Sequence, residues 1–375
     1  MKAKFGIELF FSHSYDFVRK KLKSAEKEGW DSIWLPDHLR GLPPMSIDDF
    51  LCVWPMLGSF AEMAPDLVYG VSVTEPHRLH PASLAQTATT LDHITNGKFI
   101  LGIGAGEAMN LKCYGIDYSY AVSKMREHIE IMHKFWHSEG KEINYDGRFY
   151  HLNKAVLRPP PIQKSKDGKP HIPIWVAGNG PKTKQMTGEL ADGWIPLLFS
   201  PKLYKEDLED IKKAMAKSNR DPKDFTAGAF SRIYMNDDEK KIKQQISGQK
   251  MALILAPNVL KSHGYWKDEY CELYEKVGIN PERLSLLEYD TEDLKRIRID
   301  KLFPIIKDIP DEVIRQQGLI GNEEEITKKF EQFIQSGSEY FVLEILNGAS
   351  SKNAPFTFFD VTRILAEKII PQFRD

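Results

Sequence analysis

The feature that most constrains the fold is a repeated unit in which a short apolar run, a loop and an amphipathic stretch of helical period follow one another. Eight apolar runs have the length of strands and lie at residues 5–11, 31–36, 67–73, 98–103, 172–177, 193–199, 225–235 and 340–346. Helical periodicity follows several of them, for example at 15–28 and 81–94. Buried parallel strands need helices to cover them. The sequence therefore predicts an α/β fold, a (β/α)8 TIM barrel, with a doubly wound open sheet as the alternative.

Two segments interrupt this rhythm. Residues 143–152 contain Asp146-Gly147 between two extended runs, which predicts a β-hairpin. Residues 237–310 form a long, charged and mostly helical stretch, which is too long for an ordinary connection. We interpret it as an insertion in a single domain that spans residues 1–375.

Charge and cysteine content exclude several classes of protein. The 375 residues include 51 Lys and Arg and 53 Asp and Glu, so the formal net charge is −2, which argues against a nucleic-acid partner. We find no apolar run of about 18 residues, and Glu8 and His13 interrupt the apolar N-terminus, so no membrane segment is expected. The three cysteines are widely spaced, which argues against disulfides and against a zinc site. The sequence predicts a cytoplasmic protein with a small-molecule substrate.

Polar residues that could carry chemistry follow the second and fourth predicted strands. Asp37-His38 ends the second, and a histidine there could transfer protons near neutral pH, although a capped turn with a surface histidine is an alternative. Gly104-Ala105-Gly106-Glu107 ends the fourth, where small residues allow a ligand to approach the backbone. A tight turn would explain these glycines equally well, but Glu107 favours a function.

The third and fifth strand ends carry further candidates. Residues 72–80 include His77, Arg78 and His80, and two histidines without a third partner do not indicate a metal site. Residues 177–180 precede Pro181 and could either cradle a phosphate at a helix N-terminus or form a simple turn. Because the carboxyl ends of barrel strands meet at one face, we expect all four loops to form one site.

These motifs resemble those of the luciferase-like flavin and deazaflavin oxidoreductases, and most closely the branch that uses coenzyme F420. Asp37-His38, residues 72–74 and Gly-Ala-Gly-Glu-Ala-Met-Asn at 104–110 match that branch in order and spacing. The last motif is similar to that of deazaflavin-dependent secondary alcohol dehydrogenases, whereas residues 54–58, 174–181 and 191–196 look like phthiodiolone ketoreductase-like members. The resemblance covers about residues 3–235 and 310–372.

The resemblance implies an F420-dependent oxidoreductase that transfers a hydride between the deazaflavin C5 and a small alcohol or carbonyl substrate. It implies that His38 is the acid/base on the substrate oxygen and that Glu107 is a second proton-handling group. It also implies a non-prolyl cis peptide at Ser72-Val73 and a homodimer. The implied coenzyme-binding residues are Asp37, Ser72, Val73, Thr74, Ala105, Gly106, Asn110, Ala177, Gly178, Asn179 and Gly180.

Several alternatives remain open at this stage. The chain could be an FMN-dependent monooxygenase of the same superfamily, a methylene-tetrahydromethanopterin reductase-like enzyme or a non-catalytic coenzyme-binding protein. Related dehydrogenases carry a tryptophan shortly after the histidine, where this chain has residues 39–44, so Trp54 could supply the pocket wall instead. Within the insertion, either a solvated helical elaboration or a lid that brings His263 or Trp266 to the pocket is possible.

Overall fold

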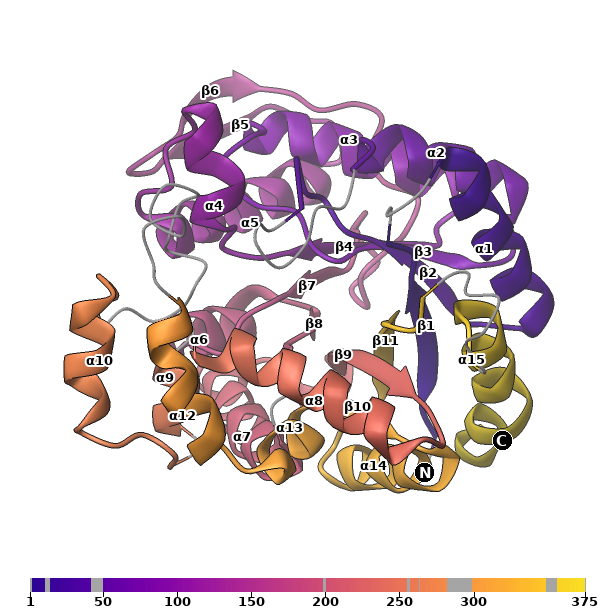
Figure 1. Cartoon of the computed structure of the whole chain (residues 1–375). Helices are drawn as coiled ribbons and strands as arrows, with labels where there is room; N and C mark the ends of the chain where they lie inside the picture. The colour runs from indigo at the N-terminus through magenta and orange to yellow at the C-terminus, as the bar shows by residue number, and fades with distance from the viewer. Residues whose placement is uncertain are drawn as a thin grey trace.

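The computed structural model describes residues 2–10, 14–41, 50–197, 200–254, 257–262, 264–281, 299–348 and 356–374. Eight parallel strands of this part of the chain close into a barrel (Figure 1). They are β1 (Lys4–Glu8), β2 (Ser32–Leu35), β3 (Val68–Val71), β4 (Phe99–Ile103), β7 (Ile174–Val176), β8 (Gly193–Trp194), β9 (Thr226–Met235) and β11 (Tyr340–Ile345). The pairing of β8 with β9 joins the two ends of the sheet. The predicted TIM barrel is confirmed, and the open-sheet alternative is wrong.

Helices follow the strands and cover the outside of the barrel (Figure 1). They are α1 (Tyr15–Glu28), α2 (Val53–Met63), α3 (Pro81–Ile94), α4 (Ala108–Leu111), α5 (Ala121–His137), α6 (Pro181–Leu190), α7 (Pro201–Lys217), α14 (Glu323–Gln335) and α15 (Phe358–Ile364). Local signals fix several ends: Gly29 ends α1 in the left-handed conformation, and Asn322 and Glu325 form a capping box on α14. The main hydrophobic core lies between strands and helices.

A second layer of apolar side chains fills the inside of the barrel. Trp34, Trp175 and Tyr340 are buried there, and the Trp175 and Tyr340 rings meet edge to face with centroids 4.9 Å apart. Glycines on neighbouring strands make room for these rings. A Cβ at Gly70 would overlap Trp34, and one at Gly193 would lie 2.6 Å from Trp175 Cδ1. Side chains therefore fill the barrel interior, and a ligand can bind at the mouth of the barrel.

The predicted insertion is helical in its described parts. It contains α8 (Glu239–Ile254), α9 (Pro257–Ser262), α10 (Tyr270–Lys276) and α12 (Phe303–Asp308), and α13 (Asp311–Gln317) follows directly after it. A short strand that the sequence did not predict, β10 (Leu319–Gly321), follows and pairs with the end of β9. These helices bury a separate apolar cluster. Trp266 packs there against Tyr270 and Tyr274, so the idea that it reaches the pocket is wrong; His263 lies outside the described residues.

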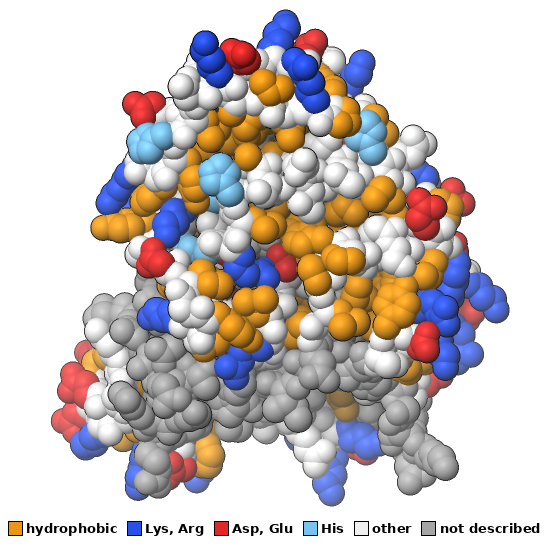
Figure 2. Space-filling model, turned by 90° about the horizontal axis from the view of Figure 1, so that it is seen from above, with side chains coloured by type: hydrophobic (Ala, Val, Ile, Leu, Met, Phe, Trp, Pro, Cys, Tyr) orange, Lys and Arg blue, Asp and Glu red, His pale blue; other side chains and the backbone are white. Residues whose placement is uncertain are grey.

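One face of the molecule carries α2, α3 and the predicted hairpin, which forms as β5 (Ile143–Asp146) and β6 (His151–Ala155). Seen from that side, hydrophobic side chains extend across the middle of the face, and most of the charged side chains lie toward its edge (Figure 2). Exposed apolar residues of these elements and the segment that follows include Ile94, Val156 and Ile162. The predicted homodimer stays a prediction. No helix in the described ranges is both long and apolar enough to cross a membrane.

Candidate active site

Three loops that carry predicted site residues leave the barrel side by side. Asp37 and His38 follow β2, residues 72–74 follow β3, and residues 104–107 follow β4. Strands β2, β3 and β4 are parallel neighbours, so their carboxyl ends lie along one edge. Barrels of this kind carry their reactive residues at this end. The strand-end rule applied to the sequence therefore located one site.

Asp37 lies at the centre of a buried ion-pair cluster. Its Oδ2 accepts a hydrogen bond from Thr74 Oγ1 at 2.7 Å and lies 2.7 Å from Arg78 Nη2. Arg78 also donates from Nε to Glu75 Oε1 at 2.5 Å. Burial alone would lower the pKa of the Arg78 guanidinium, but Asp37 and Glu75 together raise it. The cluster fixes the two predicted coenzyme ligands, Asp37 and Thr74, against each other.

His38 is held by an asparagine. Asn110 Oδ1 accepts hydrogen bonds from the backbone N–H groups of Leu39 and Arg40 at 3.1 and 3.3 Å. Its Nδ2 must therefore face the other way, where it lies 2.7 Å from His38 Nδ1 and 3.2 Å from Glu107 Oε2. Because an amide nitrogen only donates, His38 Nδ1 accepts, and the neutral ring carries its proton on Nε2. The Glu107 carboxylate is 3.5 Å from Nδ1.

A cavity of ≈ 230 Å³ opens beside this group. Its polar side is formed by Asp37, His38, Thr74 and Arg78. The remaining wall is largely apolar and comes from the loop after β2, the start of α2 and the loop before α3; it is lined by Leu39, Phe50, Leu51, Cys52, Trp54 and Leu79. Trp54 therefore lines the pocket, as the sequence predicted. An apolar pocket with a few convergent polar groups is the usual form of a small-molecule site.

The backbone at the ends of β3 and β4 borders the mouth of the barrel. The Ser72–Val73 peptide bond is cis, and Val73 packs at the edge of the interior apolar layer. Gly106 has a φ of 84°, a left-handed conformation that favours glycine. His77 Nε2 lies 3.1 Å from the carbonyl oxygen of Ala105. These residues present short side chains and backbone to the mouth, and their predicted contacts with a coenzyme stay predictions.

The predicted phosphate cradle lies at the next strand. Residues 177–180 link β7 to α6, and β7 pairs with β4. Gly180 is the N-cap of α6 and offers no side-chain cap to the first amides of that helix. Lys184 in the first turn is paired with Asp207 and Asp210, with Nζ–O distances of 2.5 and 2.9 Å. Uncapped amides at a helix N-terminus are suited to an anionic group.

An acidic pair at the mouth, buried Glu8 and half-buried Glu344, was missed by the sequence analysis. Glu8, Glu344 and Arg232 occupy matching positions on the neighbouring strands β1, β11 and β9. Arg232 Nε donates to Glu344 Oε2 at 2.8 Å, and Ser72 Oγ donates to Glu8 Oε1 at 2.5 Å. Burial, with repulsion from Glu344, raises the pKa of Glu8 well above its ordinary value. A glutamate within an otherwise apolar strand was the available signal.

The sequence profile of the family described as luciferase-like monooxygenase matches residues 4–340. A phthiodiolone/phenolphthiodiolone dimycocerosates ketoreductase of Mycobacterium kansasii is 27% identical over 356 residues, 88% of this chain and 91% of the relative. A 5,10-methylenetetrahydromethanopterin reductase of Archaeoglobus fulgidus is 26% identical over 374 residues, 99% and 100% of the two chains.

Among solved structures, an F420-dependent secondary alcohol dehydrogenase in complex with an F420-acetone adduct superposes with a TM-score of 0.76 at 21% identity, over 100% of both chains. Because the sequence identity is low, this likeness supports the fold alone. The family profile spans most of the chain, including the loops that carry Asp37, Thr74 and Glu107. The chain belongs to the luciferase-like family of oxidoreductases.

Proposed function

We propose that this protein is a coenzyme F420-dependent oxidoreductase that acts on a small alcohol or carbonyl compound. The observation that carries the proposal is the arrangement of His38, whose Nδ1 faces Asn110, so that the Nε2–H group of the neutral ring would meet a substrate oxygen. When bound, the deazaflavin supplies hydride chemistry at its C5. The names of the similar proteins, which include two reductases and an F420-dependent dehydrogenase, support this class of reaction.

The residues at the barrel mouth fit a flat ring system with an anionic tail. Val73 and Ala177 are half-buried apolar residues next to the interior layer, and they could lie against the face of a ring. Asp37 and Thr74 offer polar atoms toward its edge. The uncapped amides at the start of α6 would hold the phosphate of the tail. This assignment leaves the apolar pocket with Trp54 for the substrate.

His38 would manage the proton on the substrate oxygen. In its neutral form the Nε2–H group donates a hydrogen bond that polarises a carbonyl. Release of this proton to the oxygen would leave the ring with a proton on Nδ1, so Nδ1 would have to take up a proton and turn from the Asn110 amide nitrogen toward the Glu107 carboxylate, 3.5 Å away. The reverse transfer removes the proton from an alcohol. Assistance of this kind is worth about 10²–10⁴-fold in rate.

Binding of the coenzyme is the first experiment. The full-length protein is titrated with oxidised F420, FMN and NADP, and binding is followed by fluorescence. We expect saturable binding of F420. Binding of FMN alone would overturn the proposal in favour of a flavin-dependent monooxygenase. Turnover is then measured with secondary alcohols, ketones and a methylene-tetrahydropterin; activity confined to the pterin would assign the reductase alternative.

A second experiment tests His38. His38→Ala is expected to lower kcat by about 10²-fold or more while the affinity for F420 changes less than about twofold. The matched control is His151→Ala, because His151 lies on the exposed hairpin. Unchanged turnover in His38→Ala would remove this residue from the reaction without affecting the coenzyme assignment.

A further inference from the structure

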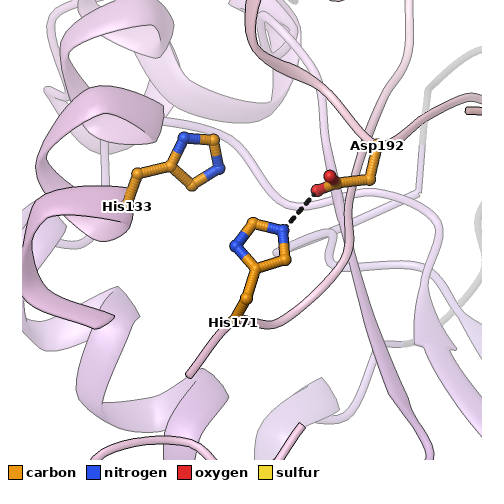
Figure 3. Close-up of side chains that lie close together, drawn as sticks. All are labelled: His133, His171 and Asp192. Atoms are coloured by element: carbon orange, nitrogen blue, oxygen red, sulfur yellow. Dashed lines mark hydrogen bonds and ion pairs between the residues drawn. The ribbon is translucent and has the colours of Figure 1, made fainter. Parts of the chain in front are cut away.

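A second polar cluster lies away from the candidate active site. His133 comes from α5, His171 from the segment before β7, and Asp192 from the turn before β8. One ligand atom from each residue lies within 4.8 Å of the other two. Figure 3 shows the three side chains pointing toward one another. Because His171 and Asp192 precede their strands, the cluster lies at the amino ends of β7 and β8, opposite the mouth.

One nitrogen of His133 lacks a partner in this cluster. Its Nε2 is buried and has no hydrogen-bond partner among the described residues. A buried polar atom without a partner destabilises the folded protein. A neutral imidazole with a free nitrogen that faces another imidazole and a carboxylate is what a transition-metal ion requires.

The other two residues are already oriented. His171 Nε2 lies 2.9 Å from Asp192 Oδ2, and its Nδ1 lies 3.1 Å from His137 Nε2. Asp192 Oδ2 also accepts a hydrogen bond from the backbone N–H of Ile174 at 2.9 Å. Although burial alone would raise it, the pKa of Asp192 is lowered by His171, which keeps the carboxylate ionised. Partners of this kind hold metal ligands in place from outside the coordination shell.

We propose that His133, His171 and Asp192 bind one divalent transition-metal ion, with zinc as the best match to two imidazoles and one carboxylate. Zinc–ligand bonds of about 2.0–2.2 Å place ligand atoms about 3.4 Å apart in a tetrahedron. The present separations, all within 4.8 Å, would have to shorten toward this value on binding. The fourth position is left for water. Arg220 Nη2, 3.8 Å from Asp192 Oδ1, is a second cation beside the carboxylate and opposes binding of the ion.

The location indicates what the ion would do. Residues at the amino ends of barrel strands contribute to stability rather than to chemistry. The ion would join α5 to the starts of β7 and β8, three elements that are otherwise distant in sequence. The sequence analysis expected no metal from the cysteine spacing and from the pair His77 and His80, and it did not single out residues 133, 171 and 192, which form no local motif. Without an ion, His171 and Asp192 would simply tie the two strands together by their hydrogen bond.

Metal titration tests the proposal. The full-length protein is freed of metal with a chelator and titrated with Co²⁺, whose visible absorption reports coordination by protein ligands, and then with Zn²⁺. We expect one equivalent of Co²⁺ to bind, Zn²⁺ to displace it, and the melting temperature to rise with Zn²⁺. If the unsubstituted protein shows no saturable binding of Co²⁺ or Zn²⁺, the site is overturned. This result does not depend on any variant.

Variants then identify the ligands. His133→Phe removes the nitrogen but keeps a ring, so it is expected to weaken Co²⁺ binding at least tenfold while the metal-free protein is no less stable, because the buried orphan atom is gone. Asp192→Asn is expected to weaken binding similarly. The matched control is His151→Gln, which removes an exposed histidine paired with Asp146. Equal affinity in His133→Phe and the parent protein would overturn the assignment.

Discussion

Asn110 decides which nitrogen of His38 is free for a substrate, and its replacement is the sharpest test of the candidate site. The amide makes four contacts, with His38 Nδ1, Glu107 Oε2 and the backbone N–H groups of Leu39 and Arg40. Asn110→Ala removes all four. Asn110→Asp is the matched variant, because it still accepts from the two backbone groups but cannot donate to His38.

The expected changes in the free energy of unfolding and in kcat follow from these contacts. A net hydrogen bond is worth about 1 kcal/mol, and the two backbone groups are only partly buried, so water replaces much of what is lost in Asn110→Ala. We expect its free energy of unfolding to fall by about 1–2 kcal/mol. Loss of the fixed His38 ring removes part of a 10²–10⁴-fold contribution, so kcat is expected to fall about 10- to 100-fold in both variants.

The assay separates a positioning role from direct contact with the coenzyme. Turnover is followed by the F420 absorbance at saturating substrate, and coenzyme affinity by fluorescence. We expect both variants to retain the parent affinity for F420 within about twofold, with the loss confined to kcat. Full turnover in Asn110→Asp would refute the reasoning, because donation to His38 would then not matter. Weaker coenzyme binding with unchanged kcat would instead make Asn110 a coenzyme ligand, as the sequence predicted.

Three further predictions concern the barrel. Gly70→Ala forces a Cβ into Trp34 and is expected to lower the free energy of unfolding by about 3 kcal/mol, whereas the control Gly248→Ala, with nothing within 4 Å, is not; equal denaturant midpoints would contradict this. Burial raises the pKa of Glu8, so the protonated side chain stabilises the fold below about pH 4.3, and this stabilisation is lost as the pH rises. The free energy of unfolding in urea is therefore expected to increase for Glu8→Gln relative to the parent protein as the pH rises. Trp54→Ala enlarges the pocket and is expected to shift kcat/KM toward bulkier substrates; an unchanged ranking would remove Trp54 from the substrate wall.

The barrel could be predicted because its signals are local. Each strand is a short apolar run, and α1 ends at the predicted residue because Gly29 adopts the left-handed conformation there. Strand β10 was missed because three residues carry little periodicity, and it forms only because β9 extends far enough to pair with it. Tertiary pairing, which no local pattern records, created that strand.

The site was predictable to a similar depth. The rule that reactive loops follow strands correctly predicted that the loops with Asp37, His38 and Glu107 lie together, and the roles of these residues stay predictions. It could not foresee that Arg78 would neutralise Asp37, since that contact depends on how the β3 loop folds back. Nor could it foresee the layer of Glu8 and Arg232 around Glu344, because strand register places those residues together.

The balance of charge at the mouth bears on how an anionic coenzyme would be held. Arg78 is matched by Asp37 and Glu75, so it adds little net positive potential. Lys184 is matched in the same way by Asp207 and a further aspartate. With a net charge of −2, the whole molecule offers no long-range attraction. The start of α6 adds a partial positive charge of about +0.5, which acts only within about one turn. If the proposed coenzyme binds here, close hydrogen bonding to those amides, rather than electrostatic steering, is expected to select its tail.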